Sequence, residues 1–208
     1  MIKTLLKTVA AAAVLATAGA AHAVPVTLTG VTLLAPASGV FGTLNGAPYS
    51  AGAGALQVDT VEMGSFVAFC IELDAELSPT YPVTYNYTTY TQDGVARVLG
   101  IYGAGGYSPA AAQVAIWEAL YDSVAGDLSA GVFTFNAPAG LLTESTALLA
   151  AAAGLSVGQY DPNSLRALEN SSYQDLVTVV PEPSTYALLL AGLIGIGFVA
   201  RRRSQDHA

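Results

Sequence analysis

Between residues 24 and 179 the sequence has no histidine and no lysine, and its only basic side chains there are Arg97 and Arg166. Without histidine, neither a Ser-His-Asp nor a Cys-His catalytic arrangement can be built in this region, and zinc sites with imidazole ligands are excluded. Thirteen acidic residues against two arginines give the region a net charge of −11. Such a surface repels nucleic acid, so we expect no nucleic-acid partner.

The N-terminus has the three parts of a secretory signal peptide. Lys3 and Lys7 form the basic part, residues 9–18 form the apolar part, and Ala21-His22-Ala23 is the cleavage site. We therefore expect residues 1–23 to be removed on export, which makes Val24 the first residue of the mature protein.

The C-terminus combines a proline-rich motif, an apolar stretch and a basic cluster. The motif is Pro181-Glu182-Pro183, the apolar stretch covers residues 186–200, and the cluster is Arg201-Arg202-Arg203. Because proline cannot continue a helix backwards, we predict a membrane helix at residues 184–200. Its fifteen apolar residues span roughly 22 Å, short of the ~30 Å hydrocarbon core. The three arginines are expected to stay cytoplasmic and to act as a membrane stop.

This C-terminal arrangement closely resembles the PEP-CTERM sorting signal of exported bacterial proteins. The resemblance implies a sorting signal at residues 180–203 and an exosortase-type sorting enzyme as a partner. It also implies an inner-membrane anchor with the ectodomain outside the cytoplasm, and later release to the cell surface or extracellular matrix. The alternative is an ordinary single-span anchor without processing.

Cys70 is the only cysteine of the chain, so no disulfide can form within it. A lone cysteine in an exported protein is either an inert core residue or a reactive one. Apolar residues alternate with others from residue 67 to residue 74, which predicts a half-buried strand. In this strand Cys70 shares a face with Glu72 and Asp74, opposite the apolar face.

A helix is predicted from residue 109 to residue 122. Ser108 and Pro109 are typical of a helix N-cap followed by proline at the first helical position. An apolar stripe at helical spacing consists of Ala110, Val114, Trp117 and Tyr121. Gln113 lies at its edge, where a glutamine can simply be solvated, and we expect Trp117 to be a core anchor.

Together, Phe69-Cys70-Ile71 and the segment from Gln113 to Ile116-Trp117 resemble the two signature motifs of bacterial surface thioester domains. The resemblance covers roughly residues 66–122. It implies that Cys70 and Gln113 are joined as an internal thioester, with Phe69, Ile116 and Trp117 as apolar pocket walls. Complement-type thioesters use a contiguous Cys-Gly-Glu-Gln motif, which this chain lacks.

We expect one α+β domain at residues 24–179, an antiparallel β barrel or sandwich with a helical part inserted after the Cys70 strand. Further strands are predicted at 26–34, 40–44, 81–90, 132–135 and 175–180, the rest of residues 39–54 is a predicted loop, and further helices are predicted at 95–103 and 141–153. No cofactor or metal is expected, since Glu72, Asp74 and Glu76 match no calcium-loop spacing.

Three functions fit this sequence. The leading one is covalent attachment, in which a Cys70–Gln113 thioester reacts once with an amine or hydroxyl of an unknown surface or matrix target. It is not enzymatic turnover. The competitor is a non-covalent exopolysaccharide or biofilm matrix protein with an inert cysteine. A hydrolase that uses two carboxylates comes third.

Overall fold

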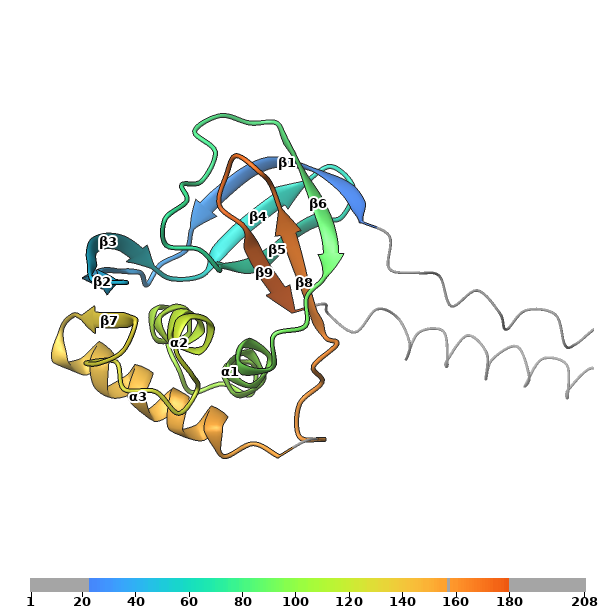
Figure 1. Cartoon of the computed structure of the whole chain (residues 1–208). Coiled ribbons are helices and arrows are strands. Elements are labelled where there is room, and N and C mark those ends of the chain that lie inside the picture. Colours follow the sequence, from blue (N-terminus) through green and yellow to red (C-terminus); the bar gives the residue numbers. More distant parts are fainter. Residues whose placement is uncertain (1–22, 157, 180–208) are drawn as a thin grey trace, which may run out of the picture.

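The computed structural model describes residues 23–156 and 158–179 (Figure 1). The predicted signal peptide, except Ala23, lies outside the described residues. The motif Pro181–Pro183, the helix 184–200 and the stop Arg201–Arg203 lie outside them too. Within the described residues no helix has both the length and the apolar character needed to cross a membrane.

Six antiparallel strands close into a barrel, which confirms the predicted α+β class and decides for a barrel over a sandwich. Side chains of residues that pair across neighbouring strands lie on the same face of the sheet. Leu56 pairs with Ala68 and is buried, so both residues belong to the inner face of the barrel. The strand order around the barrel is β1 (Val24–Leu33), β4 (Leu56–Thr60), β5 (Gly64–Cys70), β9 (Leu176–Val179), β8 (Leu165–Glu169) and β6 (Val83–Thr89).

A smaller sheet in the order β3–β2–β7 stands beside the barrel. Its strands are β2 (Ser38–Leu44), β3 (Ala47–Ala53) and β7 (Phe133–Asn136). The prediction of a loop over most of residues 39–54 is therefore wrong. Asn45 and Gly46 have φ angles of 53° and 79°, as a two-residue hairpin turn requires, and an Asn-Gly pair is the sequence signal for that turn.

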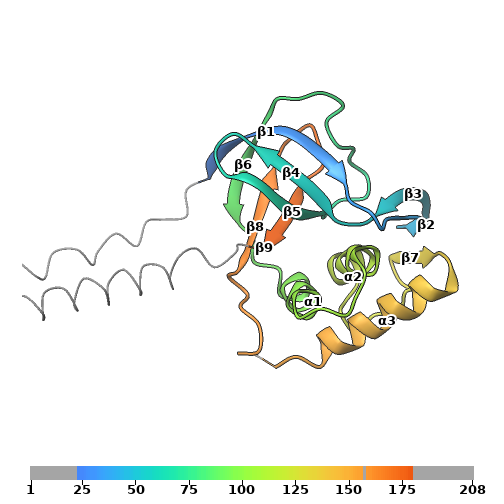
Figure 2. The same cartoon turned by 180° about the vertical axis from the view of Figure 1, so that it is seen from behind.

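Three helices cover one side of the barrel (Figures 1 and 2). They are α1 (Asp93–Gly103), α2 (Pro109–Tyr121) and α3 (Ala139–Ala153). Helix α2 packs against both other helices and against β3 and β7, so it is buried on almost every side. The Ser108 side chain caps α2 as predicted by accepting a hydrogen bond from the Ala111 N–H at 3.2 Å.

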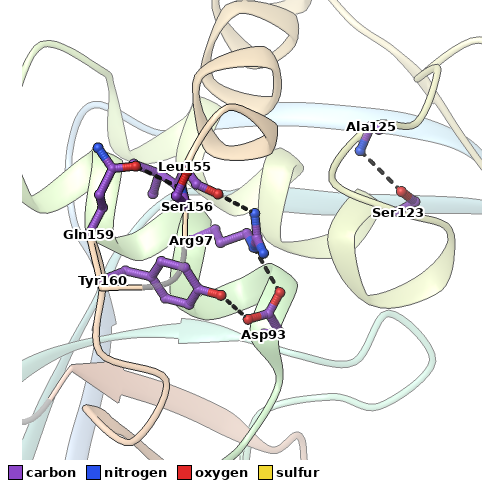
Figure 3. A network of polar contacts seen from close by, with 8 residues as sticks. All are labelled: Asp93, Arg97, Ser123, Ala125, Leu155, Ser156, Gln159 and Tyr160. Carbon is purple, nitrogen blue, oxygen red and sulfur yellow. Dashed lines mark hydrogen bonds and ion pairs between the residues drawn. The ribbon is translucent and has the colours of Figure 1, made fainter.

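Arg97 ties α1 to the segment that follows α3 (Figure 3). Its guanidinium donates to the Asp93 carboxylate at 2.7 Å and to the Leu155 carbonyl at 2.6 Å. Tyr160 adds a hydrogen bond to Asp93, and its ring centroid lies 5.0 Å from the guanidinium carbon. One of the two arginines between residues 24 and 179 therefore holds the helical part together.

Three strands, β3, β4 and β8, were not predicted, and one strand was given the wrong end. Strands β4 and β8 are only five residues each. The strand predicted at residues 67–74 instead begins at Gly64 and ends at Cys70. Glu72 and Asp74 lie in the loop that follows, so they do not share a strand face with Cys70.

Gly42 in β2 lies where no side chain fits. A Cβ atom there would overlap the carbonyl oxygen of Thr134 in the neighbouring β7. We expect Gly42→Ala to lower the free energy of unfolding by about 1–3 kcal/mol, because β2 and β7 must separate to admit the methyl group. The measurement is urea unfolding.

Gly39→Ala is the matched control in the same strand, because a Cβ atom at Gly39 meets no atom within 4 Å. Its expected effect is neutral or slightly stabilising, since alanine loses less backbone entropy than glycine. Equal destabilisation by both substitutions would show that the close approach of β2 and β7 is not the cause.

Candidate functional site

The side chain of Gln113 forms two hydrogen bonds with the backbone of Cys70, 43 residues earlier in the chain. The Cys70 N–H donates to Gln113 Oε1 at 2.9 Å, and Gln113 Nε2 donates to the Cys70 carbonyl oxygen at 2.8 Å. We call this arrangement the Cys70–Gln113 clamp. It holds the amide group of Gln113 against the residue that carries the only thiol of the chain.

Strand pairing explains why the Cys70 backbone is free to bind a side chain. Successive residues of a strand direct their hydrogen-bonding groups to opposite sides. The Ile71 N–H donates to Asp175 just before β9, so the Cys70 groups point to the β4 side. The pairing of β5 with β4 ends at Leu56 and Ala68, two residues before Cys70. The Gln113 amide therefore occupies the place of one more peptide group in the ladder.

Both residues are buried, which corrects the prediction of the face on which Cys70 lies. Gln113 has no exposed surface and Cys70 is 6% exposed, so neither is a solvated side chain. Cys70 pairs with Leu176 and belongs to the inner face of the barrel, not to a polar face. Phe69 points the other way and packs edge-to-face on Tyr102 of α1, with ring centroids 5.4 Å apart. Both faces at the end of β5 are therefore apolar.

A cavity of about 400 Å³ reaches Cys70. Its other walls come from the loop after β5 and from β3, and three carboxylates of that loop, Glu72, Asp74 and Glu76, line it. Of the three predicted pocket walls, Trp117 lines this cavity. Phe69 and Ile116 are buried but are not among the described residues that line it. The cavity therefore offers a small molecule a route between the acidic loop and Cys70.

Hydrogen bonds to α2 and to the segment before β9 hold this loop over the site, and no sequence motif predicts them. One of them joins the Gln174 N–H to the Glu76 carbonyl oxygen at 2.9 Å. The Leu73 N–H donates to the Tyr121 hydroxyl of α2 at 3.1 Å. Gln174 Nε2 donates to the Glu72 carbonyl oxygen at 2.5 Å, and the Asp175 N–H donates to a Glu72 carboxylate oxygen at 2.9 Å. No motif marks Tyr121 or Gln174, because their partners are backbone groups distant in sequence.

Burial dominates the electrostatics of the thiol. It raises the pKa of Cys70 to about 12, and the negative charge of Glu72 acts in the same direction. Burial also raises the pKa of Asp175. The hydrogen bond from the Asn170 N–H lowers this pKa, and the negative charge of Glu72 raises it. Cys70 is therefore a neutral thiol at physiological pH, protected from oxidation and slow to react with external reagents.

Glu118 is a second buried ionisable group, next to Trp117 on α2. It has no exposed surface, and neither carboxyl oxygen has a hydrogen-bond partner among the described residues. Burial raises its pKa to about 7, with smaller contributions from Asp122 and Asp127. The sequence analysis did not single out this residue, because a glutamate in a helix is normally solvated.

Comparison with known proteins identifies the C-terminal segment. Residues 179–203 match the PEP-CTERM protein-sorting motif, which confirms that prediction. The chain is therefore an exported protein that an exosortase sorts and that its C-terminal region anchors before processing. No curated protein and no solved structure matches the chain.

The free energy of unfolding should depend on pH through Glu118. The pKa of Glu118 is higher in the folded than in the unfolded chain. Its contribution to the free energy of unfolding is therefore fully present at pH values below the ordinary glutamate pKa. It is lost as the pH rises through about 7. The loss is at most about 3 kcal/mol, and urea unfolding between about pH 5 and pH 8 measures it.

Two variants separate this contribution from other titrating groups. Glu118→Gln carries no titrating proton and should flatten the profile in this pH range. Ser145→Ala, on α3, removes a buried hydroxyl that has no hydrogen-bond partner among the described residues. It carries no titrating proton, so the wild-type slope should remain. An unchanged slope in Glu118→Gln would assign the pH dependence to another group.

Sorting should depend on the proline-rich motif. Replacing Pro181, Glu182 and Pro183 together by alanine should leave the chain unprocessed in a host that has the sorting enzyme, because the enzyme has lost its recognition motif. Deleting Arg201–Arg203 should misplace the chain, since each charge costs about 3 kcal/mol at the membrane centre. Immunoblots of membrane and extracellular fractions measure both effects. Normal processing of the triple alanine variant would contradict the assignment.

Proposed function

We propose that the exported domain forms an internal thioester between Cys70 and Gln113 and uses it once, to attach the protein covalently to a surface or matrix partner. The observation that supports this most strongly is the Cys70–Gln113 clamp, with its two hydrogen bonds of 2.9 and 2.8 Å. It holds the side-chain amide of Gln113 on the backbone of the residue that carries the thiol.

In the first step the Cys70 sulfur attacks Cδ of Gln113. The S–C bond forms, the C–N bond breaks, and the nitrogen leaves as ammonia with the thiol proton. The Cys70 N–H already donates to Gln113 Oε1, so it stabilises the negative charge that develops on this oxygen. Fixed proximity can supply ~7–11 kcal/mol of the barrier reduction, which compensates for a thiol that burial keeps neutral.

Glu72 has the position for moving the thiol proton. Its side chain lines the same cavity as Cys70, and its negative charge acts on the thiol. One of its carboxylate oxygens accepts a hydrogen bond from the Asp175 N–H, which fixes the side chain beside the site. In this proposal Glu72 accepts the proton from sulfur and returns it to the departing nitrogen.

In the second step an external amine or hydroxyl enters through the cavity and attacks Cδ of Gln113. The new amide or ester bond forms, the S–C bond breaks, and Cys70 recovers its thiol with the proton of the nucleophile. The buried surroundings keep water from the thioester until then. Because residues 24–179 contain no lysine, no lysine side chain of the domain competes for the bond.

The competing proposal is a non-covalent matrix protein. The same clamp supports it, since the two hydrogen bonds satisfy a strand end that would otherwise bury an unpaired N–H and C=O. A thiol that is 6% exposed and has a raised pKa also suits an inert core residue. In both proposals the sorted protein reaches the cell surface or an exopolysaccharide matrix.

The mass of the protein exported by cells separates the two proposals. With a thioester, the mature chain weighs one ammonia less than its sequence, and methylamine adds covalently at Gln113. Cys70→Ala should abolish both the mass deficit and the adduct. Gln113→Ala should also abolish both and leave Cys70 as a free thiol, which alkylates after unfolding. Intact-mass measurement and peptide sequencing give these results.

Gln174→Ala is the matched control, because Gln174 is also buried at this cavity and also donates to a backbone carbonyl. It should keep the mass deficit. A hydrolysed thioester leaves glutamate at position 113, which peptide sequencing detects. Wild-type protein with the full sequence mass, an intact Gln113 and no methylamine adduct would refute covalent attachment.

A further inference from the structure

A second hollow lies on the outside of the barrel, where β5 and β9 meet the end of α1. Its volume is about 460 Å³. None of the described residues that line it carries an acidic or basic side chain. The hydroxyl of Thr178, in β9, donates to the Val67 carbonyl oxygen at 2.7 Å. We call it the β5–α1 groove; its walls are Phe66, Val67, Phe69, Leu99, Gly100, Tyr102, Gly103, Thr178 and Val179.

Two exposed apolar side chains line this groove, and three more lie in the β4–β5 turn and at the start of β1. Val67 and Val179, in its walls, are 46% and 42% exposed. Val61 and Met63 lie in the turn that leads into β5, and the Val61 N–H donates to Thr27 in the first half of β1. Val24, 53% exposed, begins β1. A groove whose exposed walls are apolar is typical of a surface that binds an apolar partner.

The chain itself places this groove near a bilayer. Val179 lines the groove and is the last described residue, and only residues 180–185 separate it from the apolar segment that begins at Tyr186. Six extended residues span at most about 20 Å. The start of β1 and the end of β9 lie on the same side, away from the β3–β2–β7 sheet (Figures 1 and 2). While the C-terminal region anchors the chain, the groove therefore lies close to lipid.

We propose that the β5–α1 groove contacts the apolar part of the bilayer to which the chain is anchored. The contact is hydrophobic, because the groove has no charged lining and the domain carries a net charge of −11 that anionic lipid repels. It orients the domain before processing, with the β3–β2–β7 sheet directed away from the membrane. This proposal does not depend on thioester formation.

The test places a photoreactive residue in the groove of the anchored chain. The chain that remains after signal-peptide removal is reconstituted in phosphatidylcholine vesicles with p-benzoylphenylalanine in place of Val67. Illumination should give lipid adducts at this position. The same probe in place of Phe41, an aromatic residue of β2 that is 54% exposed, should give about tenfold fewer lipid adducts. This factor is what the burial of one apolar side chain in lipid at position 67, but not at position 41, predicts.

Each other product identifies another occupant and overturns the proposal. A cross-link from position 67 to residues 180–208 would show that the C-terminal segment fills the groove, and a dimer would show a second copy of the chain. Equal lipid labelling at positions 67 and 41 would show no preferred face. Vesicles with added phosphatidylglycerol should label position 67 no better, whereas stronger labelling there would show an electrostatic contact instead.

Discussion

Much of this domain depends on two hydrogen bonds between a buried amide side chain and the end of a strand. The Cys70 N–H and C=O point away from β9, and β4 stops before it reaches them. Inside an apolar interior these groups must be paired, and Gln113 pairs both. The clamp therefore fixes where α2 meets the barrel. It also brings the side-chain amide of Gln113 to the backbone of the residue that carries the thiol, so structural support and proposed reactivity involve the same pair of residues.

The surroundings of the clamp combine protection with access. Apolar packing covers both faces at the end of β5, and it keeps the Cys70 thiol neutral. The loop after β5 leaves a cavity of about 400 Å³ that reaches the thiol between three carboxylates. Backbone hydrogen bonds to Tyr121 and Gln174 hold that loop in place. Such a site disfavours reaction with bulk solvent, which suits the thioester that we propose.

The sequence predicted the parts of this site that depend on local patterns. Ser108 and Pro109 mark the start of α2 correctly, because capping is a matter of adjacent residues. The pairing of Cys70 with Gln113 came from two motifs, since no periodicity relates residues 43 positions apart. The face of Cys70 was predicted wrongly because alternation assumes one solvent-facing side, whereas barrel closure and α1 cover both. Glu118 and Gln174 have no sequence signal, because their burial depends on the tertiary packing of distant segments.

The side-chain amide nitrogen of Gln113 gives the most direct test of covalent chemistry. Nuclear magnetic resonance of ¹⁵N-labelled mature protein, purified from exporting cells, reports the side-chain NH₂ groups of Gln113 and Gln174 separately once single-residue variants assign them. If a thioester has formed, the nitrogen of Gln113 has left, so its NH₂ signals are absent while those of Gln174 remain. A Gln113 NH₂ pair protected from exchange by its hydrogen bond to Cys70 would contradict the account and leave the clamp with a purely structural role.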